Sequence, residues 1–259
     1  MNNPQWTPAE PVPDPRHAAL LQSRASTVCR RFEDRTQAGR ALAEVLMSMD
    51  LKPPLLVLAL PRGGVPVAAQ VARALKAPLD LLLVRKIGAP AHAELAVAAV
   101  VEGSPPDVIV NPETTDLPGV NAAYIESMLP AALREIERRR MVYLKGRAPH
   151  PMAGATVIVA DDGIATGTTM KAALQALRRR RPARLIVAVP VAPYQSVVAL
   201  SDEADDVICL VEPRPFRAIG LHYLDFHQLS DGEVCEALAD ADAEASRASQ
   251  PNPSSPDRR

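Results

Sequence analysis

Two adjacent carboxylates follow an apolar segment near the middle of the chain. Asp161 and Asp162 come directly after residues 157–160, and the residues that follow read Gly-Ile-Ala-Thr-Gly-Thr-Thr through Thr169. Paired carboxylates can accept hydrogen bonds from neighbouring sugar hydroxyls. Small residues let backbone N–H groups close around a phosphate, and a helix N-terminus adds partial positive charge. This order of groups predicts a binding site for a sugar 5-phosphate.

A structural role is the alternative for these residues. Two acidic residues can simply end a strand and cap the next helix, which would be our expectation for an isolated pair. The complete order of apolar strand, two aspartates, short spacer and Thr-Gly-Thr-Thr favours the binding site instead. A Walker A loop is excluded here because no Gly-Lys-Ser/Thr sequence follows, and the segment does not match GxGxxG.

A second segment combines glycine with a basic residue. Pro61, Arg62, Gly63 and Gly64 follow the apolar residues 55–60. The two glycines permit close backbone approach, and the arginine offers a fork of donors for a phosphate. On its own, the pair of glycines is equally compatible with a simple turn.

These segments resemble a known family. Residues 157–169 are similar to the phosphoribosyl-pyrophosphate (PRPP) signature of the type I phosphoribosyltransferases, with Ala160 and Gly163 where larger aliphatic residues are usual. The Gly63–Gly64 segment resembles the pyrophosphate loop of that family. The resemblance covers most of residues 32–234, and residues 32–40 look like the opening of a poorly characterised phosphoribosyltransferase-like subgroup.

The resemblance implies a role for each segment. Asp161 and Asp162 would be the catalytic carboxylates that bind the ribose hydroxyls. The PRPP 5-phosphate would be held by Ala165, Thr166, Gly167, Thr168 and Thr169. Pyrophosphate would be engaged by Arg62, Gly63, Lys86 and, next in order, Arg85. Mg²⁺ would be carried with PRPP, and no residue is assigned as a metal ligand.

An aromatic residue late in the chain suggests where the acceptor binds. Phe216 follows Pro215 and precedes Gly220 and Asp225, an order similar to the base-binding segment of hypoxanthine-guanine phosphoribosyltransferases, in which the aromatic stacks on the purine. A small hydrophobic cap is the equally weighted alternative. Residues 88–94, or a longer segment that reaches toward Pro112, would form a lid over the site.

Other polar segments are expected to be structural. Residues 34–37, Asp-Arg-Thr-Gln, are interpreted as the N-terminus of a helix. The basic runs Arg138–Arg140 and Arg178–Arg181 favour a solvated or oligomer-facing surface over a nucleic-acid site, because the formal net charge of the chain is only −1.

Apolar patterning predicts alternating helices and strands. Helices are expected after Asp34 and over residues 65–76, 121–145, 168–181 and 194–200. Strands are expected at residues 55–60, 81–84, 95–101, 108–110, 156–160, 185–189 and 207–211. Strands without polar alternation that are separated by helices indicate a doubly wound α/β fold with a mainly parallel sheet. The resemblance adds a Rossmann-like core of the type I phosphoribosyltransferase kind and a small hood near residues 212–232.

Composition places limits on the rest of the chain. The 259 residues are 47% hydrophobic, enough for a buried core, and 26 of them are proline, concentrated at both ends. We therefore expect disordered tails at residues 1–30 and 242–259 around one domain at residues 31–241. Three distant cysteines, no signal peptide and no apolar run near 18 residues predict a cytoplasmic protein without a membrane span.

The expected function is transfer of a 5-phosphoribosyl group from PRPP to a nitrogenous base with release of pyrophosphate, and a purine-like base is the leading candidate. Such a pentosyltransferase would act in nucleotide metabolism or salvage, and would be a homo-oligomer. The alternative is a regulatory protein that binds PRPP or a nucleotide with little or no catalysis, for which the basic helices would bind RNA. A hydrolase that uses Asp162 as a base has only the carboxylates in its favour.

Overall fold

The computed structural model describes residues 31–90 and 92–248, and its centre is a parallel sheet. Five strands lie in the order β2-β1-β6-β7-β8, and each neighbouring pair is parallel. Their bounds are β2 (Leu79–Leu81), β1 (Leu55–Ala59), β6 (Thr156–Ala160), β7 (Arg184–Val191) and β8 (Asp206–Val211). The sheet confirms the predicted α/β class.

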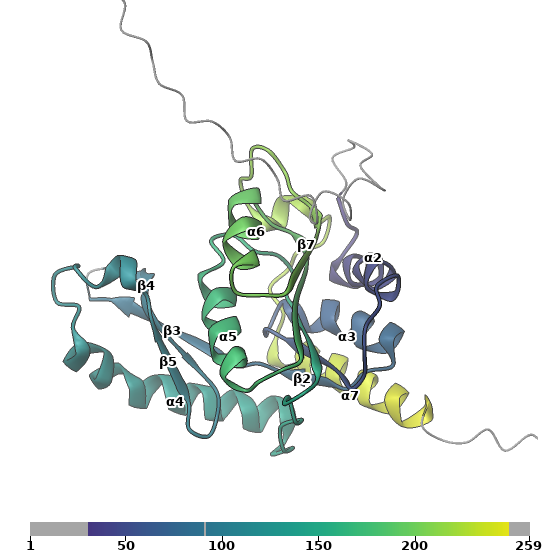
Figure 1. Ribbon diagram of the computed structural model, residues 1–259, viewed down its shortest axis with the longest axis horizontal. Helices are drawn as coiled ribbons and strands as arrows, with labels where there is room; N and C mark the ends of the chain where they lie inside the picture. The colour runs from purple at the N-terminus through teal and green to yellow at the C-terminus, as the bar shows by residue number, and fades with distance from the viewer. Residues whose placement is uncertain (1–30, 91, 249–259) are drawn as a thin grey trace, which may run out of the picture.

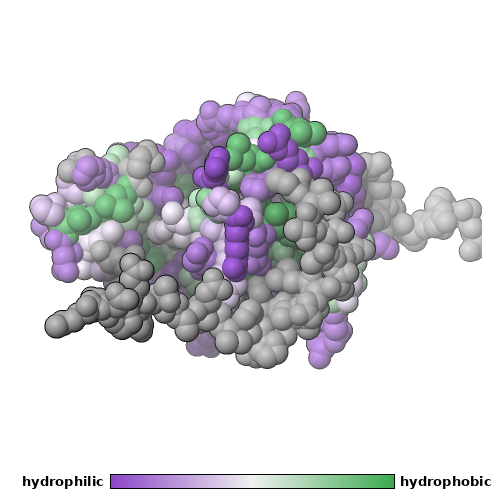
Figure 2. All heavy atoms as spheres, turned by 90° about the horizontal axis from the view of Figure 1, so that it is seen from above, coloured by the Kyte–Doolittle hydropathy of each residue, from purple (hydrophilic) through white to green (hydrophobic). Residues whose placement is uncertain are grey.

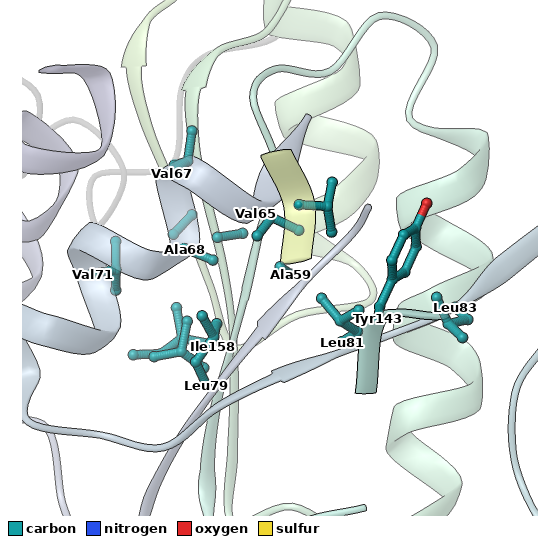
Figure 3. Close-up of a cluster of buried hydrophobic side chains, with 14 of the residues drawn as sticks. Ala59, Val65, Val67, Ala68, Val71, Leu79, Leu81, Leu83, Tyr143 and Ile158 are labelled. Atoms are coloured by element: carbon teal, nitrogen blue, oxygen red, sulfur yellow. The ribbon is translucent and has the colours of Figure 1, made fainter. Parts of the chain in front are cut away.

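Helices cover both faces of this sheet (Figure 1). One face carries α2 (Arg35–Met47), α3 (Gly64–Leu75) and α7 (Asp231–Ala248), and the other carries α5 (Thr168–Arg179) and α6 (Tyr194–Ser201). The strands divide their side chains between two cores because successive residues point to opposite faces. Val57 and Ile158 belong to the core of the α3 face, whereas Leu58 and Val159 belong to that of the α5 face. Figure 3 shows part of the first core, with Val65 and Ala68 of α3 next to Ala59 of β1.

A second, antiparallel sheet corrects the expected strand arrangement. It contains β3 (Val84–Ala89), β4 (His92–Val101) and β5 (Asp107–Val110), in that order. The strand expected at residues 81–84 does not exist as one element, because Leu81 ends β2 and Val84 begins β3. Short connections without helices join β3, β4 and β5, so these strands pair as hairpins. This sheet and the long helix α4 (Ala122–Leu144) extend away from the main sheet as an arm (Figure 1).

The Glu102 carboxylate at the end of β4 joins two elements of the arm to the segment that follows β2. The Arg140 guanidinium on α4 donates to Glu102 at 2.5 Å, and the same carboxylate accepts from the Leu83 backbone N–H at 2.9 Å. Burial raises the pKa of Glu102, although the hydrogen bonds from Leu83 and Arg140 oppose this shift. A single carboxylate therefore connects the end of β2, the end of β4 and α4.

The C-terminal region contains a helix that the periodicity analysis missed. Helix α7 runs over Asp231–Ala248 and continues beyond the expected domain end at residue 241. Val234 and Leu238 are buried against α3 in the core. Before it, residues 212–230 form an irregular segment with one short 3₁₀ turn, Ile219–His222. Residues 242–248 of the tail expected at 242–259 belong to α7, while residues 1–30 and 249–259 lie outside the described residues.

The visible surface mixes hydrophobic and hydrophilic side chains. On the face seen in Figure 2, hydrophobic side chains form separate small patches between hydrophilic ones. Among residues 31–90 and 92–248, every helix is too short or too polar to cross a bilayer.

We predict that Gly39→Ala destabilises the fold although alanine favours helices. Helices α2 and α3 approach closely at Gly39, where an added Cβ would lie 2.7 Å from the Val67 carbonyl oxygen. We expect the free energy of unfolding to fall by about 1–3 kcal/mol in urea denaturation. The control is Gly232→Ala in α7, whose Cβ would meet only the Ser230 hydroxyl at 3.7 Å. Equal stability of the two variants would contradict the close packing.

Candidate active site

The register of two neighbouring strands brings the predicted segments together. Strands β1 and β6 pair in parallel with Ala59 opposite Ala160, so the loops after them leave the same edge of the sheet. The Leu60 N–H continues the pairing by donating to the Ala160 carbonyl at 3.1 Å. The Arg62–Gly64 loop therefore begins beside Asp161. This is the carboxyl edge at which α/β proteins bind their ligands.

The two glycines are required by the approach of the aspartate side chains. A Cβ on Gly63 would lie 2.0 Å from Asp162 Oδ2, and one on Gly64 would lie 3.1 Å from Asp161 Oδ1 and 2.7 Å from the Ala160 carbonyl. Any larger residue at Gly63 would displace the Asp162 carboxylate. The Pro61–Arg62 peptide in this loop is cis. The loop and the two carboxylates thus form one continuous surface.

The two carboxylates have different surroundings. Asp161 accepts a hydrogen bond from the Asp162 backbone N–H at 2.8 Å and is partly exposed. The Asp162 side chain is only 12% exposed and accepts from Arg35 Nε at 2.8 Å. Burial raises the pKa of Asp161 well above its ordinary value of 3.8, and the charge of Asp162 adds to the shift. Burial also raises the pKa of Asp162, while the hydrogen bond from Arg35 lowers it.

The predicted phosphate loop opens α5 without a side-chain cap. Gly167 stands at the N-cap position with φ +75°, a left-handed conformation that favours glycine, and no side chain bonds to the first turn. The Thr166 and Thr168 hydroxyls lie 3.2 Å apart. The Ser196 hydroxyl on α6 fixes the loop by donating to the Ala165 carbonyl at 2.6 Å. Free N–H groups and hydroxyls at the start of a helix are suited to an anion.

The predicted pyrophosphate residues are not all brought together. Arg62 Nη1 lies 3.9 Å from Asp231 at the start of α7, so its side chain faces that carboxylate. Arg85 and Lys86 lie exposed on β3 of the arm, where they line a cavity of about 210 Å³ with Met128 and Glu135 of α4. Within the described chain, no hydrogen bond or ion pair joins Lys86 to the loop at residues 61–64.

The segment at residues 212–230 covers the aspartate loop from one side. The Tyr223 hydroxyl donates to the Asp162 carbonyl at 2.5 Å, and a Cβ on Gly163 would lie 2.6 Å from Ile219. Phe216 is partly buried and packs against the cluster of Phe32 and Tyr223. Its ring thus contributes to a hydrophobic cap and retains an exposed part.

Sequence reasoning missed Arg35. The interpretation of residues 34–37 as a helix N-terminus is correct, because the Gln37 N–H donates to Asp34 at 2.7 Å. Arg35 in the same turn nevertheless reaches Asp162, 127 residues further along the chain. Its low exposure could not be read from the sequence, since an arginine after a helix cap is usually solvated.

The basic run at the end of α5 is engaged in the fold. Arg178 forms a bidentate pair with Asp205 at 2.8 and 2.9 Å, Arg179 contacts Asp107 at 2.7 Å, and Arg180 donates to the Glu102 carbonyl. These pairs connect α5 to the main sheet and to the arm. An RNA-binding role of this run stays a prediction, since the Arg179 side chain is still 61% exposed.

The comparisons with known proteins identify the family of this chain. Residues 33–225 match the family described as "Phosphoribosyl transferase domain". The chain is 41% identical over 207 residues to "Putative phosphoribosyl transferase MT0597" of Mycobacterium tuberculosis strain CDC 1551 / Oshkosh, and equally to Rv0571c of strain ATCC 25618 / H37Rv. The match covers 80% of this chain and 46% of each relative, so the chain spans about half of their length.

A solved structure shares the fold over nearly its entire length. The crystal structure of TT1426 from Thermus thermophilus superposes with a TM-score of 0.70 and 39% sequence identity, covering 81% of this chain and 98% of that one. The chain belongs to the phosphoribosyl transferase domain family, which confirms the resemblance found in the sequence.

We predict that Asp161→Asn stabilises the protein in a pH-dependent manner. The raised pKa means that folding disfavours the charged carboxylate, so the stability lost to Asp161 grows as the pH rises above 3.8. At pH 8 the variant should melt about 2–4 °C higher, which corresponds to about 1 kcal/mol in a domain of this size. The gain should shrink as the pH falls toward 3.8. Scanning calorimetry at several pH values measures it.

The matched control is Asp116→Asn at an exposed position. Its melting temperature should equal that of the wild type at every pH. A gain for Asp161→Asn that is the same at pH 4 and pH 8 would show that the buried charge is not its cause.

Proposed function

We propose that the chain catalyses transfer of a 5-phosphoribosyl group from PRPP to a nitrogenous base. The observation that carries this proposal is the contact between the Gly63 loop and the Asp162 carboxylate at the carboxyl edge of the sheet. One side of this contact presents the open N-terminus of α5 for the 5-phosphate, and the other presents the backbone of residues 62–64 for the pyrophosphate. The ribose would lie between them, with its hydroxyls toward Asp161 and Asp162.

The reaction needs positioning and charge stabilisation more than a nucleophilic side chain. The bond between ribose C1 and the pyrophosphate oxygen breaks, and its electron pair leaves with pyrophosphate. A nitrogen lone pair of the base forms the new bond to C1, and the base loses a proton. The carboxylates would stabilise the positive charge that develops on the ribosyl ring. Arg62 would have to turn from Asp231 to meet the leaving group.

We infer that Mg²⁺ would arrive with PRPP. Over the described part of the chain, no group of three or more His, Cys, Asp or Glu side chains is placed to hold a metal ion. Mg²⁺ needs no such cage, because it takes phosphate oxygens and waters for most of its coordination. The ion would neutralise pyrophosphate charge as the bond to ribose breaks.

The acceptor would be a flat, purine-like base stacked on Phe216. Lys86 and Arg85 would approach the pyrophosphate if the arm moves toward the main sheet, with residues 88–94 as its tip. The regulatory alternative, binding PRPP or a nucleotide without turnover, keeps the same site. Pyrophosphate release during turnover distinguishes the two.

The test of the proposed site is titration calorimetry with PRPP, with and without Mg²⁺. Wild type should bind in the presence of Mg²⁺, and Asp162→Asn should bind more weakly. Thr168→Val should lose about 10- to 100-fold in affinity, since a hydrogen bond to a charged group contributes about 1.5–3 kcal/mol. The control is Thr115→Val. The exposed Thr115 hydroxyl donates to the Pro112 carbonyl, and its loss should leave PRPP binding unchanged. No PRPP binding by folded wild type would overturn the proposal.

A separate prediction concerns the base. Phe216→Leu keeps an apolar side chain for the hydrophobic cap but removes the flat ring. We expect the KM for the preferred base to rise about 5- to 100-fold, because base stacking is worth about 1–3 kcal/mol, with PRPP affinity and melting temperature unchanged. Pyrophosphate release measured over a panel of purine and pyrimidine bases gives the KM values. A KM equal to that of wild type would assign Phe216 to the cap alone. Leu224→Ala, at a residue 69% exposed, is the control from the same segment.

A further inference from the structure

Arg35 contacts the site and its cover at the same time. Its side chain is 9% exposed, and Nε donates to Asp162 Oδ2 at 2.8 Å. From the other side of the guanidinium, Nη1 donates to the His227 carbonyl at 3.0 Å, and the group lies 4.0 Å from the centre of the Phe226 ring. One buried cation therefore joins α2, the aspartate loop and the segment at residues 212–230, which we call the hood.

The contacts form a closed circuit. Phe226 stacks on Tyr223 with ring centres 5.0 Å apart, and the Tyr223 hydroxyl returns to the Asp162 carbonyl. Backbone hydrogen bonds hold the same segments together, from Phe32 N–H to the His222 carbonyl and from Leu224 N–H to the Phe32 carbonyl, each at 2.8 Å. A displacement of the hood would therefore move Arg35, which donates the hydrogen bond to the Asp162 carboxylate.

The charges around Asp162 explain why a cation is needed there. The titratable groups that face it are Asp161 on its own loop, Arg35 from α2 and Tyr223 from the hood. Burial and the Asp162 charge raise the pKa of Tyr223, so this phenol stays neutral. Asp161 adds negative charge. Arg35 is therefore the group in this set that favours a charged Asp162.

We propose that Arg35 is a positioning residue that holds Asp162 against the Gly63 loop as a hydrogen-bond acceptor and couples it to the hood. The inference rests on the proposed function, because the use of Asp162 by a ribose hydroxyl belongs to that proposal. Arg35 itself does not touch the substrate. It makes the ribose side and the base side of the site depend on one another.

The test compares Arg35→Gln, Arg35→Lys and the control Arg40→Gln, an exposed arginine on the same helix. In Arg35→Gln, the pH at which kcat/KM for PRPP falls on the acid side should rise by about one pH unit or more. A shift of this size is expected when a carboxylate loses an opposite charge at this distance. Arg35→Lys should restore the limb toward that of wild type. Because lysine lacks the fork that also binds the His227 carbonyl, its KM for the base should still rise. Arg40→Gln should match wild type in the pH dependence of kcat/KM for PRPP and in the KM for the base.

A merely structural role predicts a different result. All Arg35 variants would then lose melting temperature and active fraction, and the pH limb would stay in place, which would overturn the inference. If Arg35→Gln does not fold, Arg35→Met supplies the same loss of charge on an unbranched stem.

A second measurement separates this inference from the proposed function. The Asp162 carboxyl of the ligand-free protein can be titrated by ¹³C NMR, with its signal assigned through Asp162→Asn. The pKa of Asp162 should rise when Arg35 loses its charge and return with Arg35→Lys, whether or not PRPP binds. An unchanged titration would overturn the role of Arg35, whereas a shifted titration without PRPP binding would overturn the proposed function alone.

Discussion

The parallel pairing of β1 with β6 is the constraint on which the site depends. Because Ala59 stands opposite Ala160, the two loops leave the sheet at the same level, and the Asp162 carboxylate lies directly against Gly63. That closeness explains why glycine occupies positions 63 and 64, where a Cβ would meet a carboxylate oxygen or the Ala160 carbonyl. A left-handed backbone is not the reason for these glycines, because neither Gly63 nor Gly64 has a positive φ. Their function is to leave room.

Burial of charge beside that contact is costly for the fold. Two adjacent aspartates are held where burial raises the pKa of each, and one of them is paired with a buried arginine. A fold selected for stability alone would place such groups in water, because a buried ion pair rarely gains what desolvation costs. Keeping them is expected of a surface that must meet hydroxyls or developing positive charge. Packing among the aromatic rings of Phe32, Tyr223 and Phe226 holds these charged groups in place.

Local sequence order predicted the contiguous parts of the site, the family resemblance added the loop at residues 61–64, and Arg35 was missed. The strand at residues 156–160, the aspartates and the start of α5 at Thr168 are all read from one stretch of chain. The role of Arg35 was not predicted because its partner lies 127 residues away. Helix α7 was not predicted because its small and acidic residues give a weak apolar pattern. Strands β4 and β5 were predicted over most of their length, whereas β3 was not predicted, and the separate antiparallel sheet follows from the short connections between these strands. The roles of Lys86 and Phe216 stay predictions.

The arm and the hood meet the main sheet through different kinds of contact, which bears on how each can move. The arm is held by the hydrogen bond from the Leu83 N–H to Glu102 and by the arginines at the end of α5, contacts that lie at the base of β4 and β5. Farther along the arm, Gly88 of β3 is joined to α4 by the Tyr124 hydroxyl, which donates to the Gly88 carbonyl at 2.7 Å. The hood instead packs directly on Asp162. Motion of the hood would therefore change the surroundings of Asp162.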